Sequence, residues 1–177
     1  MKQLVGTGMK RLHREWRRRT QGRLGLVLDD VQGPFNVGAI IRTAAALRVD
    51  DVWLTARTPD PEDVKVGKTA LGTQRYLTFH REEHTLTALA AARAADYQVV
   101  AIELADGAGA LHDLALGPAT CLVVGHEDRG CTSAVLAACD AVAYLPLLGK
   151  VGSLNVATAA SVACYEVRRQ GWMAGPD

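Results

Sequence analysis

The sequence predicts an α/β fold with a mostly parallel sheet covered by helices on both faces. Short apolar runs of strand length recur along the chain. Segments with apolar residues at helical spacing separate these runs. The strand-like runs are apolar almost throughout, which is typical of parallel strands buried on both faces.

The first half of the chain starts this alternation. LGLVLD (24–29) is an apolar run that ends at an acid, so it is expected to be a buried strand. A helix is expected over 36–49, where Val37, Ile40, Ile41, Ala44 and Leu47 recur at helical spacing. DVWLT (51–55) is the second expected strand. Residues 56–74 are polar and irregular, with one helical turn expected near Val66–Leu71.

The second half continues the same pattern. RYLTFH (75–80) alternates like a strand, and HTLTALAAARAA (84–95) is expected to be helical. The strands YQVVAIEL (97–104) and ATCLVVG (119–125) are separated by the glycine-rich ADGAGA. A helix over 132–139, a strand over 141–147 and a helix over 155–170 complete the domain. The tail GWMAGPD is expected to fray, with Trp172 available to dock on a partner.

Length and composition indicate one soluble domain. Of 177 residues, 49% are hydrophobic and 22% are charged, which suits a globular core. No apolar run reaches the roughly 18 residues of a membrane helix, and the N-terminus lacks the apolar stretch of a secretory signal. The four cysteines show no CxxC pairing and are expected to be reduced thiols in a cytoplasmic protein, without a metal.

The charge is unevenly distributed. Residues 1–25 hold eight Lys/Arg and one acid, whereas the rest hold twelve Lys/Arg and eighteen acids. We therefore divide the chain into a basic extension, 1–22, and a domain, 23–177. The extension is expected to contact RNA through Lys10, Arg11, Arg14, Arg17, Arg18 and Arg19. Trp16 and His13 among these cations suit stacking on unpaired bases, although a solvated helix face is the alternative.

Two nucleotide-binding motifs are excluded. GKT at 67–69 is not a phosphate-binding loop, because Glu62 stands where that motif needs glycine. The GxGxxG fingerprint is absent after the first strand, where the chain reads DDVQGPFN. A ligand is still expected at the carboxyl ends of the strands, as in other α/β folds. The loops there are 30–36, 55–74, 104–111, 125–131 and 146–154.

Two polar side chains mark the helix over 36–49. Asn36 opens it and is expected to cap its first turn. Arg42 lies opposite the apolar stripe, with Ala39, Thr43, Ala45 and Ala46 around it. A lone arginine among small residues suggests a face that another chain or a ligand covers, although an ordinary exposed arginine is the alternative.

Two further stretches combine glycine with polar residues. In VVGHEDRG (123–130), Gly125 permits close backbone approach, and Glu127 can accept hydrogen bonds from a neighbouring loop or from a ligand amine. In LPLLGKVGSLNVATAA (145–160), either Ser153 or Asn155 can cap the last helix. The small residues of that helix suit tight packing inside the fold or against a second subunit.

Together, these stretches resemble the SpoU-type, TrmH-like RNA 2′-O-ribose methyltransferases of the SPOUT superfamily. FNVGAIIRTA (35–44), LVVGHEDRG (122–130) and LPLLGKVGSLNVATAA (145–160) are similar to the family's three motifs, in the family's order. The resemblance covers roughly 24–170. It implies a SPOUT fold with a deep C-terminal trefoil knot, S-adenosylmethionine (SAM) as methyl donor, and a homodimer whose sites borrow residues from the partner.

The resemblance also implies roles for individual residues. The SAM site would include Leu104, Gly125, His126, Leu145, Leu147, Ser153 and Leu154. Arg42 would activate the ribose hydroxyl. Because a guanidinium stays protonated, we expect Arg42 to stabilise charge on the 2′-oxygen and its phosphate. Asn36, Glu127, Ser153 and Asn155 would complete the catalytic set by holding the loops and the target nucleotide. His126 stands where the family usually has Asn, which suggests altered donor or RNA contacts.

The expected function is SAM-dependent methylation of a ribose 2′-hydroxyl in tRNA, with no metal. Two alternatives stay open at this point: the same reaction on ribosomal RNA, and a non-catalytic RNA-binding module on the same fold. The basic extension is short, whereas larger rRNA-directed members often carry a separate N-terminal RNA-binding domain. This difference favours tRNA. Retention of all the expected catalytic positions favours an enzyme.

Overall fold

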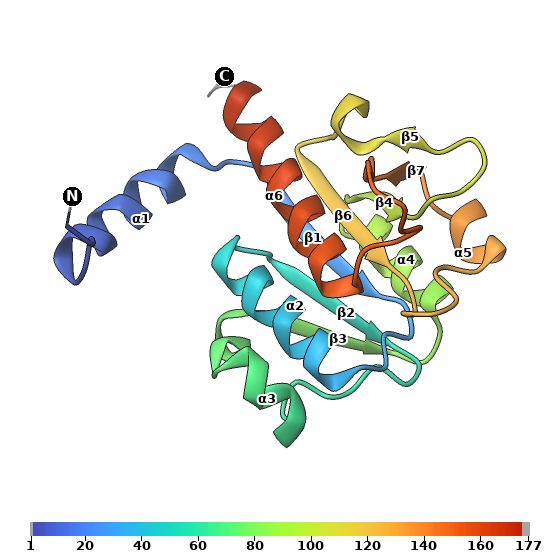
Figure 1. The fold of residues 1–177 in the computed structure, drawn as a ribbon, viewed down its shortest axis with the longest axis horizontal. Helices are drawn as coiled ribbons and strands as arrows, with labels where there is room; N and C mark the ends of the chain where they lie inside the picture. The colour runs from blue at the N-terminus through green and yellow to red at the C-terminus, as the bar shows by residue number, and fades with distance from the viewer. Residues whose placement is uncertain (1, 175–177) are drawn as a thin grey trace.

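The computed structural model describes residues 2–174 and contains one seven-stranded, all-parallel sheet (Figure 1). The strands are β1 (Arg23–Leu28), β2 (Asp51–Thr55), β3 (Thr78–Glu82), β4 (Gln98–Ile102), β5 (Gly109–Ala110), β6 (Ala119–Val124) and β7 (Ala141–Tyr144). Their order across the sheet is β3-β2-β1-β6-β4-β7-β5. The predicted α/β fold is confirmed.

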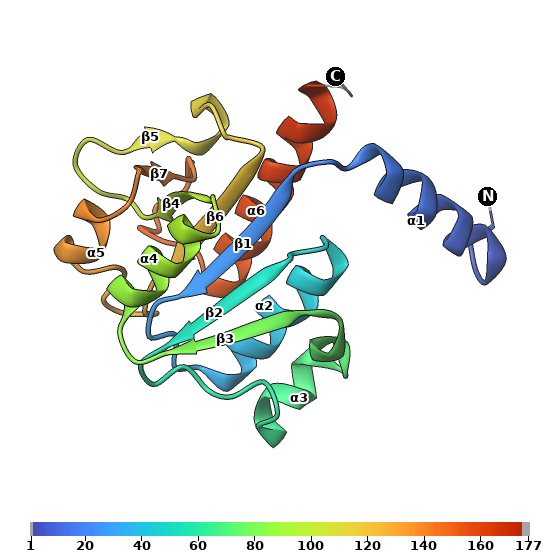
Figure 2. The same cartoon turned by 180° about the vertical axis from the view of Figure 1, so that it is seen from behind.

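The helices are α1 (Thr7–Arg19), α2 (Pro34–Ala46), α3 (Val64–Ala70), α4 (Thr85–Ala94), α5 (Ser133–Ala137) and α6 (Val156–Ala174). Four of them cover the two faces of this sheet. Helices α2 and α6 pack on one face and α4 and α5 on the other, as Figures 1 and 2 show from opposite sides. Among residues 2–174, none of the helices has the length and apolar character needed to cross a bilayer.

The strand order places a crevice at one edge of the sheet. The chain runs outward from β1 to β3, then crosses over, so β6 and not β4 lies beside β1. The last residues of these neighbours, Leu28 and Val124, are in register. In open parallel sheets, ligands bind outside the carboxyl ends of strands at such a reversal of order. The segments that follow β1, β4, β6 and β7 therefore meet at this edge.

The starts of α2 and β3 differ from the prediction, β5 was not predicted, and β7 ends at Tyr144 instead of at residue 147. Helix α2 begins at Pro34 with Gly33 at the N-cap, so Asn36 lies inside the first turn and the predicted cap is wrong. Proline is favoured at the first helical position because its missing N–H would have no helical partner there. Strand β3 begins at Thr78, because a 3₁₀ turn occupies Thr73–Tyr76. The two-residue edge strand β5 was not expected, and its sequence GA carries no strand signal.

Helix α6 presents its small residues to the core. Ala157, Ala160, Ala163 and Cys164 are all buried, so these side chains pack inside the fold. Arg168 is also buried and donates to the carbonyl oxygens of Leu47 (2.9 Å), Gly22 and Arg48. This arginine ties α6 to the end of α2 and to the segment before β1.

Helix α1 stands apart from the domain and has no buried residues (Figure 1). Trp172 of α6 contacts the C-terminal end of α1. The ring centroids of Trp16 and Trp172 lie 4.9 Å apart, and Trp172 Nε1 donates to Thr20 Oγ1 at 2.7 Å. The expectation of a frayed tail is therefore wrong as far as Ala174, because Trp172 docks on the chain's own N-terminal segment. Residues 175–177 of that tail lie outside the described residues.

The implied trefoil knot concerns how the chain threads and not how strands pair. Helix α6 returns from β7 across the sheet, where Gln170 Nε2 donates to the carbonyl oxygen of Leu111 at 3.3 Å. This contact joins the last helix to the segment between β5 and β6. The knot itself stays an implication of the family likeness.

Candidate functional site

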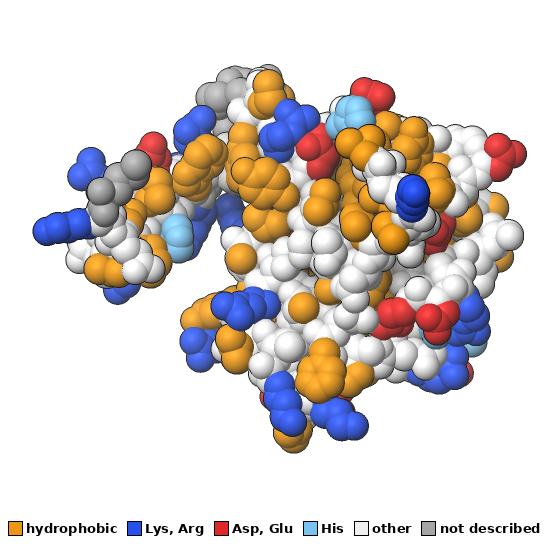
Figure 3. All heavy atoms as spheres, viewed as in Figure 1, with side chains coloured by type: hydrophobic (Ala, Val, Ile, Leu, Met, Phe, Trp, Pro, Cys, Tyr) orange, Lys and Arg blue, Asp and Glu red, His pale blue; other side chains and the backbone are white. Residues whose placement is uncertain are grey.

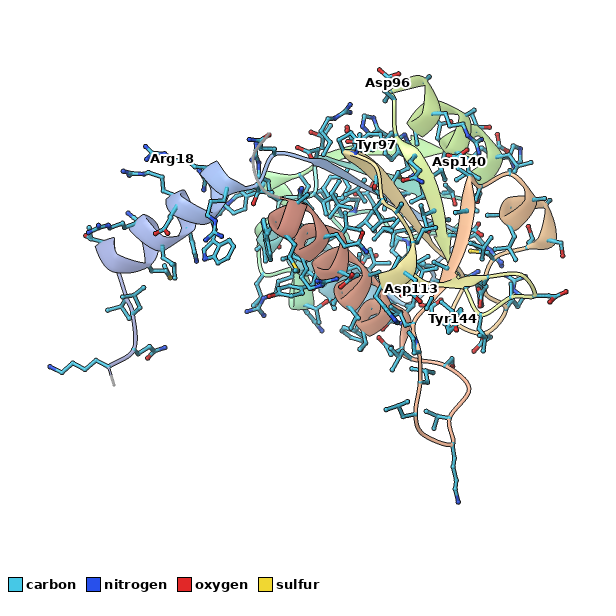
Figure 4. All side chains as sticks on the ribbon, turned by 90° about the horizontal axis from the view of Figure 1, so that it is seen from above. Arg18, Asp96, Tyr97, Asp113, Asp140 and Tyr144 are labelled. Carbon is cyan, nitrogen blue, oxygen red and sulfur yellow. The ribbon has the colours of Figure 1, made fainter. Side chains whose placement is uncertain are left out.

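A cavity of about 670 Å³ lies at the carboxyl ends of β4, β6 and β7. All seven residues expected to bind the cofactor line it, namely Leu104, Gly125, His126, Leu145, Leu147, Ser153 and Leu154. Residues 145–147 and 151–154 form one wall, and the segment 145–154 projects beyond Tyr144 at the end of β7 (Figure 4). Loop 55–74, which was also expected at the ligand, does not line this cavity.

Gly125 makes the tight turn after β6 possible. A Cβ atom at this position would lie 2.4 Å from the carbonyl carbon of Gly130 and 2.5 Å from the backbone nitrogen of Cys131. Real Cβ atoms do not approach backbone this closely, so only glycine fits without moving the loop. The expected close approach is therefore between the beginning and the end of the turn 125–131. This turn forms part of the cavity wall.

Glu127 joins two loops that lie far apart in the sequence. Its Oε1 accepts from Gly33 N at 2.8 Å and from Asn36 Nδ2 at 3.0 Å, and its Oε2 accepts from Gln32 N at 3.1 Å. Asn155 Nδ2 then donates to Asn36 Oδ1 at 3.0 Å. Three of the five expected catalytic residues thus form one continuous hydrogen-bonded group beside the cavity.

The position of Asn155 follows from helix capping. Its Oδ1 accepts from the backbone nitrogens of Ala157 (2.9 Å) and Thr158 (3.3 Å), so it caps α6. Of the two expected caps, Asn155 is the one used. Ser153 is exposed and is one of the residues that line the cavity.

The hydrogen bonds decide the ionisation of Glu127. Burial would raise its pKa, but donation from Asn36 and from the backbone of Gln32 and Gly33 outweighs burial and lowers the pKa below its ordinary value. Glu127 therefore stabilises the loop contact while ionised. That stabilisation is complete above a carboxylate's ordinary pKa of about 4.3, and it is lost as the pH falls through the lowered value.

Arg42 lies outside the cavity. It is exposed on α2, whose first turn carries Asn36, and no acid among residues 2–174 forms an ion pair with it. Next to it, Thr43 Oγ1 contacts Ser161 Oγ at 2.9 Å, which joins α2 to α6. The structure therefore does not bring Arg42 to the cavity of its own chain.

The six cations expected to bind RNA all lie on α1 and are exposed. Figure 3 shows Lys and Arg side chains around this helix, and Figure 4 shows Arg18 directed away from the domain. Arg19 also stacks over the Trp16 ring, with its guanidinium carbon 4.5 Å from the centroid. Helix α1 precedes the amino end of β1, so it leaves the domain at the edge opposite the cavity.

The sequence pattern of the SpoU rRNA methylase family matches residues 23–165. That stretch contains the whole cavity wall and the group formed by Asn36, Glu127 and Asn155. The chain belongs to the SpoU rRNA methylase family. The SpoU-family match begins at the first strand, so the basic extension 1–22 lies before it.

Individual relatives agree with this assignment. A tRNA (guanosine(18)-2′-O)-methyltransferase from Escherichia coli is 32% identical over 157 residues, which are 89% of this chain and 68% of that protein. An AdoMet-bound rRNA methyltransferase from Sinorhizobium meliloti is 30% identical, with a TM-score of 0.79, over 85% of this chain and 57% of that chain. A structure concerned with 2-OH methylation of C/U34 on tRNA is 30% identical, with a TM-score of 0.76. It aligns with 85% of this chain and 97% of its own.

The match covers 68% of the length of the Escherichia coli enzyme and 55% of the length of an uncharacterized tRNA/rRNA methyltransferase from Synechocystis sp., which is 35% identical over 86% of this chain. The matched part still contains all three motifs and every residue of the cavity wall. The SpoU fold is thus established for this chain.

Sequence patterns did not reveal three charged side chains in the SpoU-family cavity wall, Glu103, Asp128 and Arg129. Glu103 falls within the strand expected over 97–104, although β4 ends at Ile102. Its carboxylate accepts from Cys131 N at 3.0 Å and thereby supports the turn after Gly125. The sequence signal that could have identified Glu103 is an acid directly after an apolar strand, the same pattern that Asp29 shows.

His126 occupies the second-motif position at which the resemblance implies Asn. Its Nδ1 accepts from Asp128 N at 3.1 Å, so the neutral ring carries its proton on Nε2. The carbonyl oxygen of His126 accepts from Gly130 N at 2.8 Å. The side chain thus stabilises the turn in which it lies, as an asparagine oxygen also can, and its effect on donor binding stays a prediction.

We expect Glu127→Gln to loosen the contact between the loops after β1 and β6. A glutamine replaces one acceptor oxygen with an NH₂ group, which would face the N–H donors of Gln32, Gly33 or Asn36. Amide hydrogen exchange at Gln32 and Gly33 should therefore become faster, and SAM affinity should fall by about tenfold, the loss of one charge-assisted hydrogen bond.

Asp128→Asn is the matched control. It removes the same charge from the same loop, but the Asp128 carboxylate takes no part in the Glu127 contacts. Exchange at Gln32 and Gly33 should then stay as in the unmodified chain. Unchanged exchange in Glu127→Gln would show that the carboxylate does not hold these loops together.

Proposed function

We propose that the protein is a SAM-dependent RNA 2′-O-ribose methyltransferase. The observation that carries this proposal is the cavity, whose wall combines the second and third SpoU motifs beside the hydrogen-bonded group of Asn36, Glu127 and Asn155. The AdoMet-bound relative from Sinorhizobium meliloti supports SAM as the donor.

The residues present fit SAM. A cavity of about 670 Å³ falls within the range that holds ligands of this size. Leu104, Leu145, Leu147 and Leu154 offer an apolar slot for the adenine. Glu103, Glu127 and Asp128 outnumber the single cation Arg129 in the wall, which suits a positively charged sulfonium. When bound, SAM supplies an already activated methyl group.

We place Arg42 at the cavity of a second copy of the chain. It is exposed on α2 and does not line its own cavity, so a homodimer would let it reach the partner's site. There its guanidinium would hold the 2′-oxygen and the neighbouring phosphate and stabilise negative charge as the hydroxyl proton leaves. We also place the protein in the cytoplasm, where four free thiols such as these stay reduced.

We favour tRNA as the substrate. The structure concerned with tRNA C/U34 methylation aligns with this chain over 97% of its own length, and the Escherichia coli relative acts on tRNA guanosine 18. The Sinorhizobium meliloti enzyme is described for rRNA, so rRNA is the second candidate. A non-catalytic RNA-binding module is disfavoured, because every expected catalytic position is retained.

Two measurements on the full chain test the proposal. Isothermal titration should detect SAM binding, and incubation with labelled SAM should transfer methyl to bulk tRNA more efficiently than to rRNA. Transfer to rRNA alone would overturn the choice of tRNA. SAM binding without transfer to either would favour the non-catalytic module, and no SAM binding would overturn both enzyme assignments.

We expect helix α1 to contribute most of the sequence-independent RNA affinity. Replacing Lys10, Arg11, Arg14, Arg17, Arg18 and Arg19 with glutamine should weaken tRNA binding and flatten its salt dependence, because each phosphate contact adds about 0.7 to 0.9 to the slope of log K against log salt. Filter binding at several salt concentrations measures this slope. An unchanged slope would show that the basic side of α1 is only a solvated face.

A further inference from the structure

Two arginines from different loops meet on one aspartate at the carboxyl edge of the sheet. Asp30 Oδ2 accepts from Arg57 Nη2 at 2.9 Å, from Arg129 Nη2 at 3.0 Å and from Gln32 Nε2 at 3.0 Å. Asp30 Oδ1 accepts from Arg57 N at 3.1 Å. The side chain of Asp30 is only 17% exposed, so this carboxylate anchors both guanidinium groups.

The backbone at this place is strained. Asp30 and Ala56 both have positive φ, 55° and 47°, in the turns that end β1 and β2. Aspartate tolerates this conformation better than most residues, whereas alanine rarely adopts it, and such strain is concentrated at functional positions. The two turns bring Asp30 beside Arg57, although 27 residues separate them in the sequence.

Both guanidinium groups retain donors for a further partner. The side chains of Arg57 and Arg129 are 68% and 63% exposed. Each group has five N–H donors, and within residues 2–174 each side chain donates from Nη2 alone. Hydrogen bonds from Arg57 and Gln32 outweigh burial and hold the pKa of Asp30 below its ordinary value, so the carboxylate stays ionised. Arg57, Arg129 and Asp30 together therefore carry a net charge of +1.

The stability of the fold is a weak reason for these two ion pairs, because exposed ion pairs contribute little to the free energy of folding. Their position beside the cavity is more informative. Arg129 lines the cavity, and Gln32, beside Asp30, donates its backbone N–H to Glu127. Glu127 and Asp128 lie on the same loop as Arg129, so the surrounding field is not broadly positive. The arrangement therefore suits direct contact with a single anion better than long-range attraction. Figure 3 shows blue and red side chains gathered together at this edge of the sheet.

We propose that Arg57 and Arg129, held together by Asp30, bind one phosphate of the RNA backbone near the target nucleotide. This inference rests on the proposed function, because it names a contact for the same RNA substrate. A guanidinium presents N–H groups in a planar fork that matches phosphate oxygens. A contact of this kind positions the RNA without reading its sequence. It would fix the ribose relative to the cavity mouth, independently of the contacts made by α1.

The test uses the full chain and fluorescently labelled bulk tRNA without SAM. Arg57→Gln is the main variant, because Arg57 does not line the cavity. The dissociation constant should rise about tenfold, and the slope of log K against log salt should fall by about one phosphate contact. Isothermal titration should show unchanged SAM affinity. Arg129→Gln should act in the same way on RNA, and the double variant should add little because both arginines hold one phosphate.

Arg93→Gln is the matched control. Arg93 is also a partly exposed arginine that forms an ion pair with one aspartate: its Nη2 lies 3.0 Å from Asp140 Oδ1. Asp140 precedes β7 and lies at the opposite edge of the sheet from the cavity. Arg57→Lys is a second variant that keeps the charge and should keep most of the salt slope while losing part of the affinity.

The outcomes separate this inference from the proposed function. In one outcome, the unmodified chain binds SAM and tRNA, and Arg57→Gln and Arg57→Lys bind tRNA as tightly as the control Arg93→Gln. The phosphate site is then refuted, and the enzyme assignment stands. If the unmodified chain binds neither SAM nor tRNA, the proposed function fails, and this inference fails with it. A selective loss of tRNA affinity and salt slope in Arg57→Gln supports the phosphate site.

Discussion

Replacing Arg42 with alanine is expected to lower methyl transfer by about 100- to 1000-fold or more, the usual cost of removing a group that stabilises charge in the transition state. SAM affinity should stay within about twofold, because Arg42 does not line the cavity of its own chain. Single-turnover transfer measures the first effect and isothermal titration the second. Lys68→Ala, which removes an exposed cation from the neighbouring helix α3, should change neither.

A mixed dimer tests whether Arg42 acts on the partner's site. One chain carries Arg42→Ala, and the other carries Gly125→Ala, which is expected to prevent SAM binding. If Arg42 acts across the interface, the chain with the intact cavity receives an intact arginine from its partner, and about half of the activity returns. An inactive mixed dimer would place Arg42 in its own chain's site. A large loss of SAM affinity in Arg42→Ala alone would show that its assigned role is wrong.

The second large effect is expected at Gly125. Alanine there would press its methyl group into the backbone of Gly130 and Cys131, both closer than 3 Å. Because backbone atoms on that side cannot turn away as a side chain can, the whole 125–131 turn must shift. This turn carries Glu127 and forms the cavity floor, so SAM binding should fall below detection. A loss of about 1–3 kcal/mol in the free energy of unfolding should accompany it.

Gly149→Ala is the control for this substitution. Gly149 lies in the projecting 145–154 segment, and a Cβ atom there meets no other atom within 4 Å. Thermal unfolding and SAM titration should both stay near the values of the unmodified chain. If Gly125→Ala bound SAM as well as Gly149→Ala does, the close approach after β6 would not be what shapes the site.

The parallel sheet could be predicted because its strands are apolar almost throughout. LGLVLD, DVWLT and ATCLVVG needed no tertiary information, and their observed bounds differ by one or two residues at most. The start of α2 was harder to predict. Asn36 is a good N-cap residue, but Pro34 determines where the helix starts, and Asn36 is used for a contact with Glu127, 91 residues away.

The remaining contacts could not be predicted from the sequence, because they join residues that are far apart along the chain. Glu127 was expected to serve either a loop or a ligand, and the choice depends on how the segment 30–36 folds back to the end of β6. The docking of Trp172 on Trp16 and the meeting of Arg57 with Arg129 likewise join distant segments. No local pattern predicts such pairs. Arg42 stood out in the sequence as a lone cation among small residues, but its position outside the cavity could be learned only from the structure.

The central claim is that this cavity holds SAM for methylation of a ribose hydroxyl, and alkaline hydrolysis of labelled product tests it most directly. The unmodified chain is incubated with methyl-labelled SAM and bulk tRNA, and the tRNA is then digested with alkali. Alkaline cleavage of RNA requires a free 2′-hydroxyl, so a 2′-O-methyl group protects the adjacent phosphodiester bond. We predict that the label appears in alkali-stable dinucleotides and disappears in Arg42→Ala. Label in mononucleotides, which would indicate methylation of a base, would contradict the account.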